Sequence, residues 1–420
     1  IVSREAISRE KKSAGDLMRG HSILRGRIEY SALIVLVYLL GRSIPIPWVV
    51  YQEPENVGNG IQALIGSFLG SSISTTSLFS LGLTPWVTAM VVVSVFQKTV
   101  QDKTQKRSPG QSNRKILVLA SFLAVVQALI GAGKMQYRPY GNLRATELWL
   151  LTAVVLVGGS FLIRWLVGRN TAWGIGGQAL IILVNILGNL RTMATEMIRT
   201  AGMRPVRLLL ILAAGLVIVL AMLFLEGGEF RNTVRRIGIN NLYAADDYIA
   251  IRLTPAGTMP VMYVMSFFTL PYYVLLVLRI FLPGSAWIDE GLSVLNLNQT
   301  AGVWIFGGLL LVLTVVLSVI MVGPGEIARN LEQQGDYLDY MEPGRETALH
   351  LFGQTVTAAL FSGVVTWLLV IPPLFARAVQ GSSSGLYMAP MTIMVAAGMA
   401  AELLEEAKVY RTMESYRPFL

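Results

Sequence analysis

The residues that could carry out chemistry lie outside the long apolar segments of this chain. Both histidines, His21 and His350, fall in polar stretches, and no Asp or Glu lies in the middle of an apolar segment. Imidazole and carboxylate groups are the usual metal ligands, proton carriers and ion-coupling groups inside a membrane. We therefore expect no metal site, no His-centred catalysis and no proton- or sodium-coupled transport.

The remaining chemical motifs are also missing from the sequence. The chain contains no Cys, which excludes disulfides and thiolate chemistry. It has no phosphate-binding loop, nucleophile elbow or zinc-protease motif. Arg164 is the clearest charge inside an apolar segment, and near a helix end its side chain can reach the membrane interface. We expect a passive pathway rather than an enzyme, with no cofactor and with any work done by a partner.

The elements that must build such a pathway are ten apolar stretches. Hydrophobic residues make up 54% of the 420 residues and charged residues only 14%, with a mean hydropathy of +0.58. The stretches do not alternate as barrel strands do, so an all-α polytopic membrane protein is predicted. The expected spans are 28–43, 78–96, 116–131, 148–167, 175–190, 208–225, 257–278, 303–322, 352–375 and 386–401.

The distribution of positive charge predicts the orientation. Most of the 34 Lys and Arg residues fall on one side if the N-terminus is cytoplasmic, which by the positive-inside rule places both termini in the cytoplasm. Residues 1–27 are expected to form a cytoplasmic amphipathic segment, not a cleavable signal peptide, and 402–420 a cytoplasmic tail. The densest basic cluster, 98–115, is either a topology anchor near anionic lipid or a docking site for a cytoplasmic partner.

Several connections between the spans are unusual. Ile44-Pro-Ile-Pro47 precedes an apolar run, 61–69, that is too short to cross and is predicted to be a re-entrant plug or an interfacial helix. Two long cytoplasmic loops, 226–252 and 323–350, are too small for catalytic domains and are expected to be hairpins gripped by a soluble partner.

A short repeated sequence pattern suggests that the chain consists of two related halves. Gly82-Leu-Thr-Pro85 and Gly257-Thr-Met-Pro260 stand near helix starts five spans apart, and five is odd. The halves, 28–190 and 191–401, would then insert in opposite orientations around a central pathway.

Five sequence blocks, each at an expected span boundary, together resemble the SecY family, the channel subunit of the bacterial protein-export translocon. They are 42–47, 77–86, 173–178, 254–260 and 327–335, the last followed by Pro343-Gly344. The resemblance implies a multi-pass protein of the bacterial plasma membrane. It also implies two five-helix halves around a pore, with a lateral gate between the second and seventh spans.

The resemblance also implies roles for particular residues. An apolar ring would close the pore, formed by Leu83, Val87, Ala179, Leu183, Met262 and, from the tenth span, Met391, with Met388 as the alternative. Such a ring excludes ions by dewetting and offers a passing chain nothing to bind. The plug would be 56–70, with apolar residues Ile61, Leu64, Ile65 and Leu69.

Two departures from the family pattern favour its accessory branch. Glu342 stands where the housekeeping family carries Arg, and the loop at 231–241 is shorter and less basic. These loops are the expected contacts of a cytoplasmic motor, with Arg235, Arg236, Glu342 and Arg345 as the contact residues. The accessory branch exports serine-rich glycosylated adhesins with a dedicated accessory SecA.

The partners implied are a SecA-type ATPase, SecE- and SecG-like small subunits, a secretory preprotein and membrane lipid, but no nucleic acid. Three alternatives stay open: a housekeeping SecY, a secondary transporter of small solutes, and a lipid flippase or scaffold without a pore. The polar residues available for a transporter pocket are Thr84, Thr88, Gln178 and Asn185.

Overall fold

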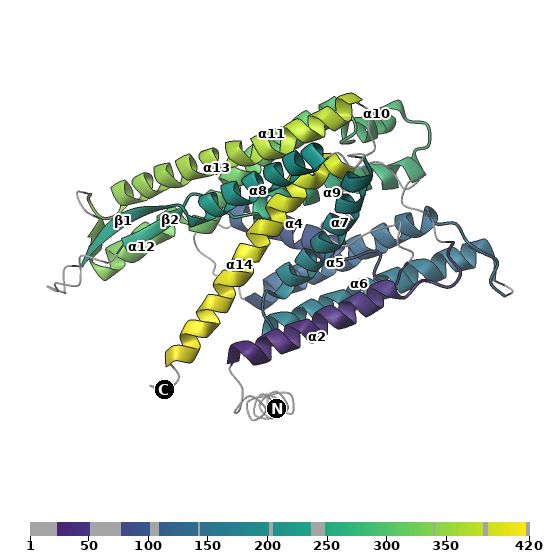
Figure 1. Ribbon diagram of the computed structural model, residues 1–420, viewed down its shortest axis with the longest axis horizontal. Helices are drawn as coiled ribbons and strands as arrows, with labels where there is room; N and C mark the ends of the chain where they lie inside the picture. Colours follow the sequence, from purple (N-terminus) through teal and green to yellow (C-terminus); the bar gives the residue numbers. More distant parts are fainter. Residues whose placement is uncertain are drawn as a thin grey trace.

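The computed structural model describes residues 23–50, 77–100, 109–141, 143–200, 205–236, 248–338, 341–380 and 385–416. The described residues form mainly α-helices, with one small sheet at one end of the molecule (Figure 1). The whole predicted plug and most of the predicted N-terminal segment lie outside the described residues.

Each of the ten predicted apolar stretches falls largely within one helix. These helices are α2 (Ile23–Ser43), α4 (Thr84–Val100), α5 (Pro109–Gly133), α6 (Ala145–Trp173), α7 (Gly177–Thr200), α8 (Pro205–Gly227), α9 (Met259–Phe281), α11 (Thr300–Val322), α13 (Arg345–Gln380) and α14 (Ala389–Tyr416). Among the described residues, six helical stretches, in α5, α6, α7, α9, α11 and α13, are long and apolar enough to cross a membrane. A membrane location is thereby supported, while the count of ten spans stays a prediction.

Two span boundaries were predicted wrongly. The second span was expected from residue 78, but 78–83 form turns and α4 begins at Thr84, because Gly82 takes a left-handed φ of +60° that a helix does not allow. The tenth was expected over 386–401. Instead, Gly385–Met388 is a short 3₁₀ helix, η3, and α14 runs on to Tyr416, because the polar residues beyond Ala401 are strong helix formers.

The two long loops fold together rather than as separate hairpins. The first supplies β1 (Glu229–Arg236) and β2 (Tyr248–Arg252), and the second supplies a short helix, α12 (Pro324–Gln334), and β3 (Asp336–Leu338). The strands form one antiparallel sheet in the order β2-β1-β3. Val234, Ile251, Leu331, Leu338 and Leu351 form its separate core with α12 and α13. The described part of the second loop is therefore not a hairpin, because its strand β3 pairs with β1 of the first loop.

Most of the long helices share one large apolar core, whereas α5 packs into two smaller apolar clusters. In Figure 1, α2, α5 and α6 lie along one side and α11 and α13 along the other, with α4, α7 and α9 between them. α14 packs against α2, α7 and α8 and ends at the C-terminus, away from the body. A short helix, α10 (Ala286–Val294), connects α9 to α11.

Candidate functional site

Helices α4 and α9 start in the same way and pack against each other. Gly82 and Gly257 both have left-handed backbone, with φ of +60° and +55°. In each case the helix begins two residues later and carries proline, Pro85 or Pro260, at its second position. Proline there costs no helical hydrogen bond, because the first amides of a helix have no intrahelical partner. The repeated Gly-x-x-Pro pattern thus starts the two helices predicted to form a lateral gate.

The predicted apolar ring draws residues from four regions of the chain. Leu83 and Val87 at the start of α4 and Met391 in α14 are buried, with at most 1% of their surface exposed. Leu183 in α7 and Met262 in α9 are partly buried and pack against the same hydrophobic cluster. Five of the six residues thus belong to, or pack against, the large hydrophobic core that most of the helices share, and their arrangement as a ring stays a prediction. Ala179 is partly buried at the start of α7.

The chain on either side of 51–76 is held beside the start of α4. The amide of Leu78 donates to the carbonyl oxygen of Ile44 at 3.1 Å, and Pro45 bridges to Ser77. The amide of Val50 donates to the carbonyl oxygen of Gln136 at 2.9 Å. The predicted plug residues Ile61, Leu64, Ile65 and Leu69 lie outside the described residues, so their role stays a prediction.

A buried polar side chain, Asn185, connects helices α2 and α7, and this role was not predicted from the sequence. Asn185 in α7 is fully buried, and its amide oxygen accepts hydrogen bonds from the Tyr38 hydroxyl at 2.6 Å and the Arg42 guanidinium at 2.8 Å. Both donors come from α2. Because that oxygen is engaged from two sides, Asn185 braces α2 against α7 and does not offer the oxygen to a solute.

The motor-contact residues predicted from the two loops lie on one folded unit. We define the sheet platform as β1, β2, β3, α12 and residues 341–345, which lead into α13 and whose Met341 packs against the core of the sheet. Arg235 and Arg236 lie on β1 opposite Tyr337 and Asp336 of β3. Glu342 and Arg345 are exposed at the start of α13.

Side-chain contacts fasten the sheet platform to α13. Asn232 of β1 and Gln354 of α13 exchange two amide hydrogen bonds, at 2.7 and 2.9 Å. An open groove of about 290 Å³ runs between the sheet and α12. The platform is thus fixed to the helices while one face stays accessible.

A group of acidic side chains lies where the platform meets α14, and it was not predicted from the sequence. Arg252 of β2 forms an ion pair with Glu405 of α14 at 2.9 Å. Glu226 lies one residue past the predicted sixth span. Burial, followed by repulsion from Glu402 and Glu405, raises its pKa from 4.5 to about 7.

α14 also contacts the opposite side of the molecule. The Gly176 amide donates to Glu406 at 2.7 Å, and the Arg27 guanidinium stacks on the Tyr410 ring at 4.2 Å. The polar half of α14 therefore links the end of α8 and β2 to the start of α7 and to α2.

Comparison with known proteins decides the family. The SecY family model matches residues 77–404, which is most of the chain. The chain belongs to the SecY family. This membership confirms the resemblance carried by the five sequence blocks and replaces the transporter and flippase alternatives.

Curated SecY relatives match over almost the full length. The accessory Sec system protein translocase subunit SecY2 of Streptococcus parasanguinis is 30% identical, over 95% of this chain and 96% of the relative. The SecY2 proteins of Streptococcus agalactiae serotype Ia and Streptococcus salivarius are 28% and 25% identical, covering 94% of this chain and 96% and 98% of their own lengths. These relatives are named for the accessory branch that Glu342 and the short loop at 231–241 favoured.

Solved structures show that the fold is that of SecY and Sec61 channels. One, described as "The structure of a protein conducting channel", has a TM-score of 0.66 at 13% identity and covers 93% of both chains. A Sec61 structure from the canine ribosome-channel complex has a TM-score of 0.61, also at 13% identity, and covers 93% of both chains.

Proposed function

We propose that this chain is the protein-conducting subunit of an accessory Sec translocon in a bacterial plasma membrane. The observation that carries the proposal is the match of the SecY family model to residues 77–404. Within that family fold, Leu83, Val87, Leu183, Met262 and Met391 belong to the large apolar core or pack against it, and we propose that they form the ring. A collar of leucine, valine and methionine excludes hydrated ions when closed. Its flexible members can repack around the varied side chains of an unfolded polypeptide.

The path of the substrate follows from the helices around this ring. An unfolded preprotein passes through the ring, and its signal segment leaves for the lipid between α4 and α9. The contact between helices α4 and α9 supports a gate at this place. The matching Gly-x-x-Pro starts of these helices support ten spans in two inverted halves, 28–190 and 191–401, with both termini cytoplasmic.

The energy for moving the preprotein comes from a partner protein. A SecA-type ATPase, the accessory form, docks on the sheet platform through Arg235, Arg236, Glu342 and Arg345 and pushes the preprotein inward. SecE- and SecG-like small subunits complete the complex. The substrate class is serine-rich glycosylated adhesins, by the likeness to relatives named for the accessory system.

Ion conductance tests the ring directly. Leu83, Val87, Leu183 and Met262 are each replaced by Ser, and the purified complex is inserted into planar bilayers. The resting ion leak should rise in each variant, because a hydroxyl at the constriction lets water wet it. Leu187→Ser is the matched control, since Leu187 lies one turn beyond Leu183 on α7 and is 54% exposed. Background conductance in all four ring variants would refute the ring assignment.

A further inference from the structure

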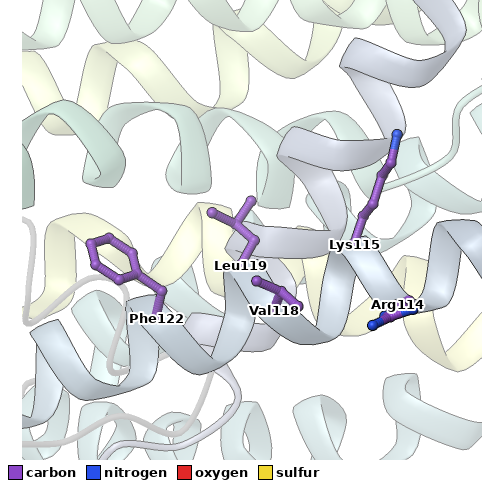
Figure 2. Close-up of a pocket in the computed structure, with 5 residues that line it drawn as sticks. All are labelled: Arg114, Lys115, Val118, Leu119 and Phe122. Atoms are coloured by element: carbon purple, nitrogen blue, oxygen red, sulfur yellow. The ribbon is translucent and has the colours of Figure 1, made fainter.

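A small cavity lies where five elements of the chain meet. Its volume is about 140 Å³, and α8, β2, α9, α11 and α14 all contribute residues to its wall. We call it the junction cavity. The larger hollow along α5, of about 640 Å³, is lined by residues of that one helix (Figure 2). A change of charge in the junction cavity therefore acts on several elements at once, whereas a change in the α5 hollow acts on one.

Negative charge is in excess in the junction cavity. Glu226 lies in the last turn of α8, and Glu402 and Glu405 lie on α14. Arg252 of β2 is the one basic side chain among the described residues that line the cavity, and it pairs with Glu405 at 2.9 Å. The wall residues from α9 and α11, Met259 and Met321, carry no charge. Glu226 therefore meets two carboxylates on α14 and a single arginine that is already paired.

The two remaining carboxylates lie beside the start of α9. A Cβ added at Gly257 would stand 3.4 Å from the Oε1 atom of Glu402. A Cβ added at Gly398, one turn before Glu402 on α14, would stand 2.0 Å from the Cγ2 atom of Thr258 and 2.8 Å from the Oε1 atom of Glu226. α14 thus approaches both Glu226 and the first residues of α9 as closely as a glycine allows.

The charge on Glu226 decides whether this close approach is favourable. Burial, followed by repulsion from Glu402 and Glu405, raises the pKa of Glu226 to about 7. Below that pH the side chain is neutral and packs against α14 without repulsion. Above it, an ionised Glu226 repels the two carboxylates of α14 at the point where α14 also touches the start of α9.

We propose that a proton on Glu226 holds the start of α9 against α14. The consequence for transport rests on the proposed function, in which α9 forms one side of the lateral gate. A fall in cytoplasmic pH then keeps the gate closed, and a rise releases α9 from α14.

Proton linkage gives the size of the effect. In a released state Glu226 meets water and has its ordinary pKa of 4.5, whereas in the packed state its pKa is about 7. The packed state therefore holds the proton more tightly. The ratio of released to packed molecules should rise about ten-fold per pH unit between these two values and stay constant at higher pH.

Two spin labels test the proposal, because the chain has no native cysteine. Met259→Cys places one label at the start of α9, and Leu404→Cys places the other on the exposed surface of α14. The full chain is reconstituted in vesicles, and the distance between the labels is measured by pulsed electron paramagnetic resonance from pH 5.5 to pH 8. A second, longer distance should appear, and its ratio to the short one should rise about ten-fold per pH unit up to about pH 7 and then level off.

Three variants identify the group responsible. Glu226→Gln has nearly the same shape but cannot ionise, so it should show the short distance at every pH. Glu402→Gln removes one repelling carboxylate and should make the change with pH smaller. Glu290→Gln is the matched control, because Glu290 is exposed on α10, far from the junction cavity, and it should leave the pH dependence unchanged.

Two results would overturn the proposal. One is a distance distribution that stays the same from pH 5.5 to pH 8 in the chain with all its carboxylates. The other is a pH-dependent distance that survives Glu226→Gln. Ion leak through the reconstituted complex tests the gate separately and should be larger at pH 7.5 than at pH 5.5. A distance that changes with pH while the leak stays constant would support the proton-dependent contact and contradict the assignment of α9 as a gate helix.

Discussion

Replacing Gly159 by Ala tests whether the start of α4 is set by close packing. Gly159 lies in α6, and a Cβ added there would stand 2.0 Å from the carbonyl oxygen of Leu78, whereas ordinary contact begins at 3.4 Å. The backbone at Leu78 must therefore retreat by about 1.4 Å. Leu78 begins the turns that lead into Leu83, so the displacement reaches the apolar ring.

The size of the effect follows from two opposing terms. Overpacking a filled site costs about 1–3 kcal/mol. The higher helix propensity of alanine returns about 1 kcal/mol. We expect Gly159→Ala to lower the free energy of unfolding by about 1 kcal/mol net.

The neighbouring glycine is the matched control. A Cβ at Gly158 meets nothing within 4 Å, so Gly158→Ala should be stabilising by up to about 1 kcal/mol. Thermal unfolding of both variants in one detergent compares them, and bilayer conductance reports on the ring. Gly159→Ala should melt lower than Gly158→Ala and leak more ions. Equal melting temperatures and equal leak would refute the reasoning.

Two further predictions concern the contacts between the sheet platform and the long helices. In a double-mutant cycle of Asn232→Ala and Gln354→Ala, unfolding free energies should show a coupling of about 1 kcal/mol, because either single change removes both hydrogen bonds between the two amides. Simple additivity would contradict the bracing role. Glu226 holds its proton more tightly in the folded chain, so its contribution to stability is lost as pH rises from 4.5 to about 7. The Glu226→Gln variant should therefore have a higher melting temperature than the unchanged chain at pH 8 and the same melting temperature at pH 4. If the melting temperatures of the two proteins change equally with pH, Glu226 does not titrate in this window.

The sequence was sufficient to predict a helix where the residues of that helix alone form an apolar stretch. Each apolar stretch predicted a helix because hydropathy depends only on neighbouring residues, and the Gly-x-x-Pro pattern lies close to the starts of α4 and α9. The boundary at Leu78 was missed, because an apolar turn and an apolar helix have the same composition. The length of α14 was missed for the opposite reason, since its polar half gives no hydropathy signal.

Contacts between residues far apart in the sequence could not be predicted. Strand β3 pairs with β1, which lies about one hundred residues earlier in the chain. Three residues, Asp336–Leu338, are too few for a strand to be predicted from the sequence. The raised pKa of Glu226 arises first from burial and then from repulsion by Glu402 and Glu405, and both causes exist only in the folded chain. Asn185 was assigned to a possible solute pocket because its partners Tyr38 and Arg42 lie on α2, far away in sequence.

Site-specific crosslinking of a stalled secretory chain tests the central claim most directly. Leu83→Cys and Met262→Cys each place the chain's only thiol in the apolar ring, and Val154→Cys places it on the exposed surface of α6. A substrate carrying one cysteine in its stalled segment is driven in by the accessory ATPase and then oxidised. Disulfide-linked products should form at Leu83→Cys and Met262→Cys and be absent at Val154→Cys. No product at either ring position, with the substrate engaged, would contradict a pathway through this ring.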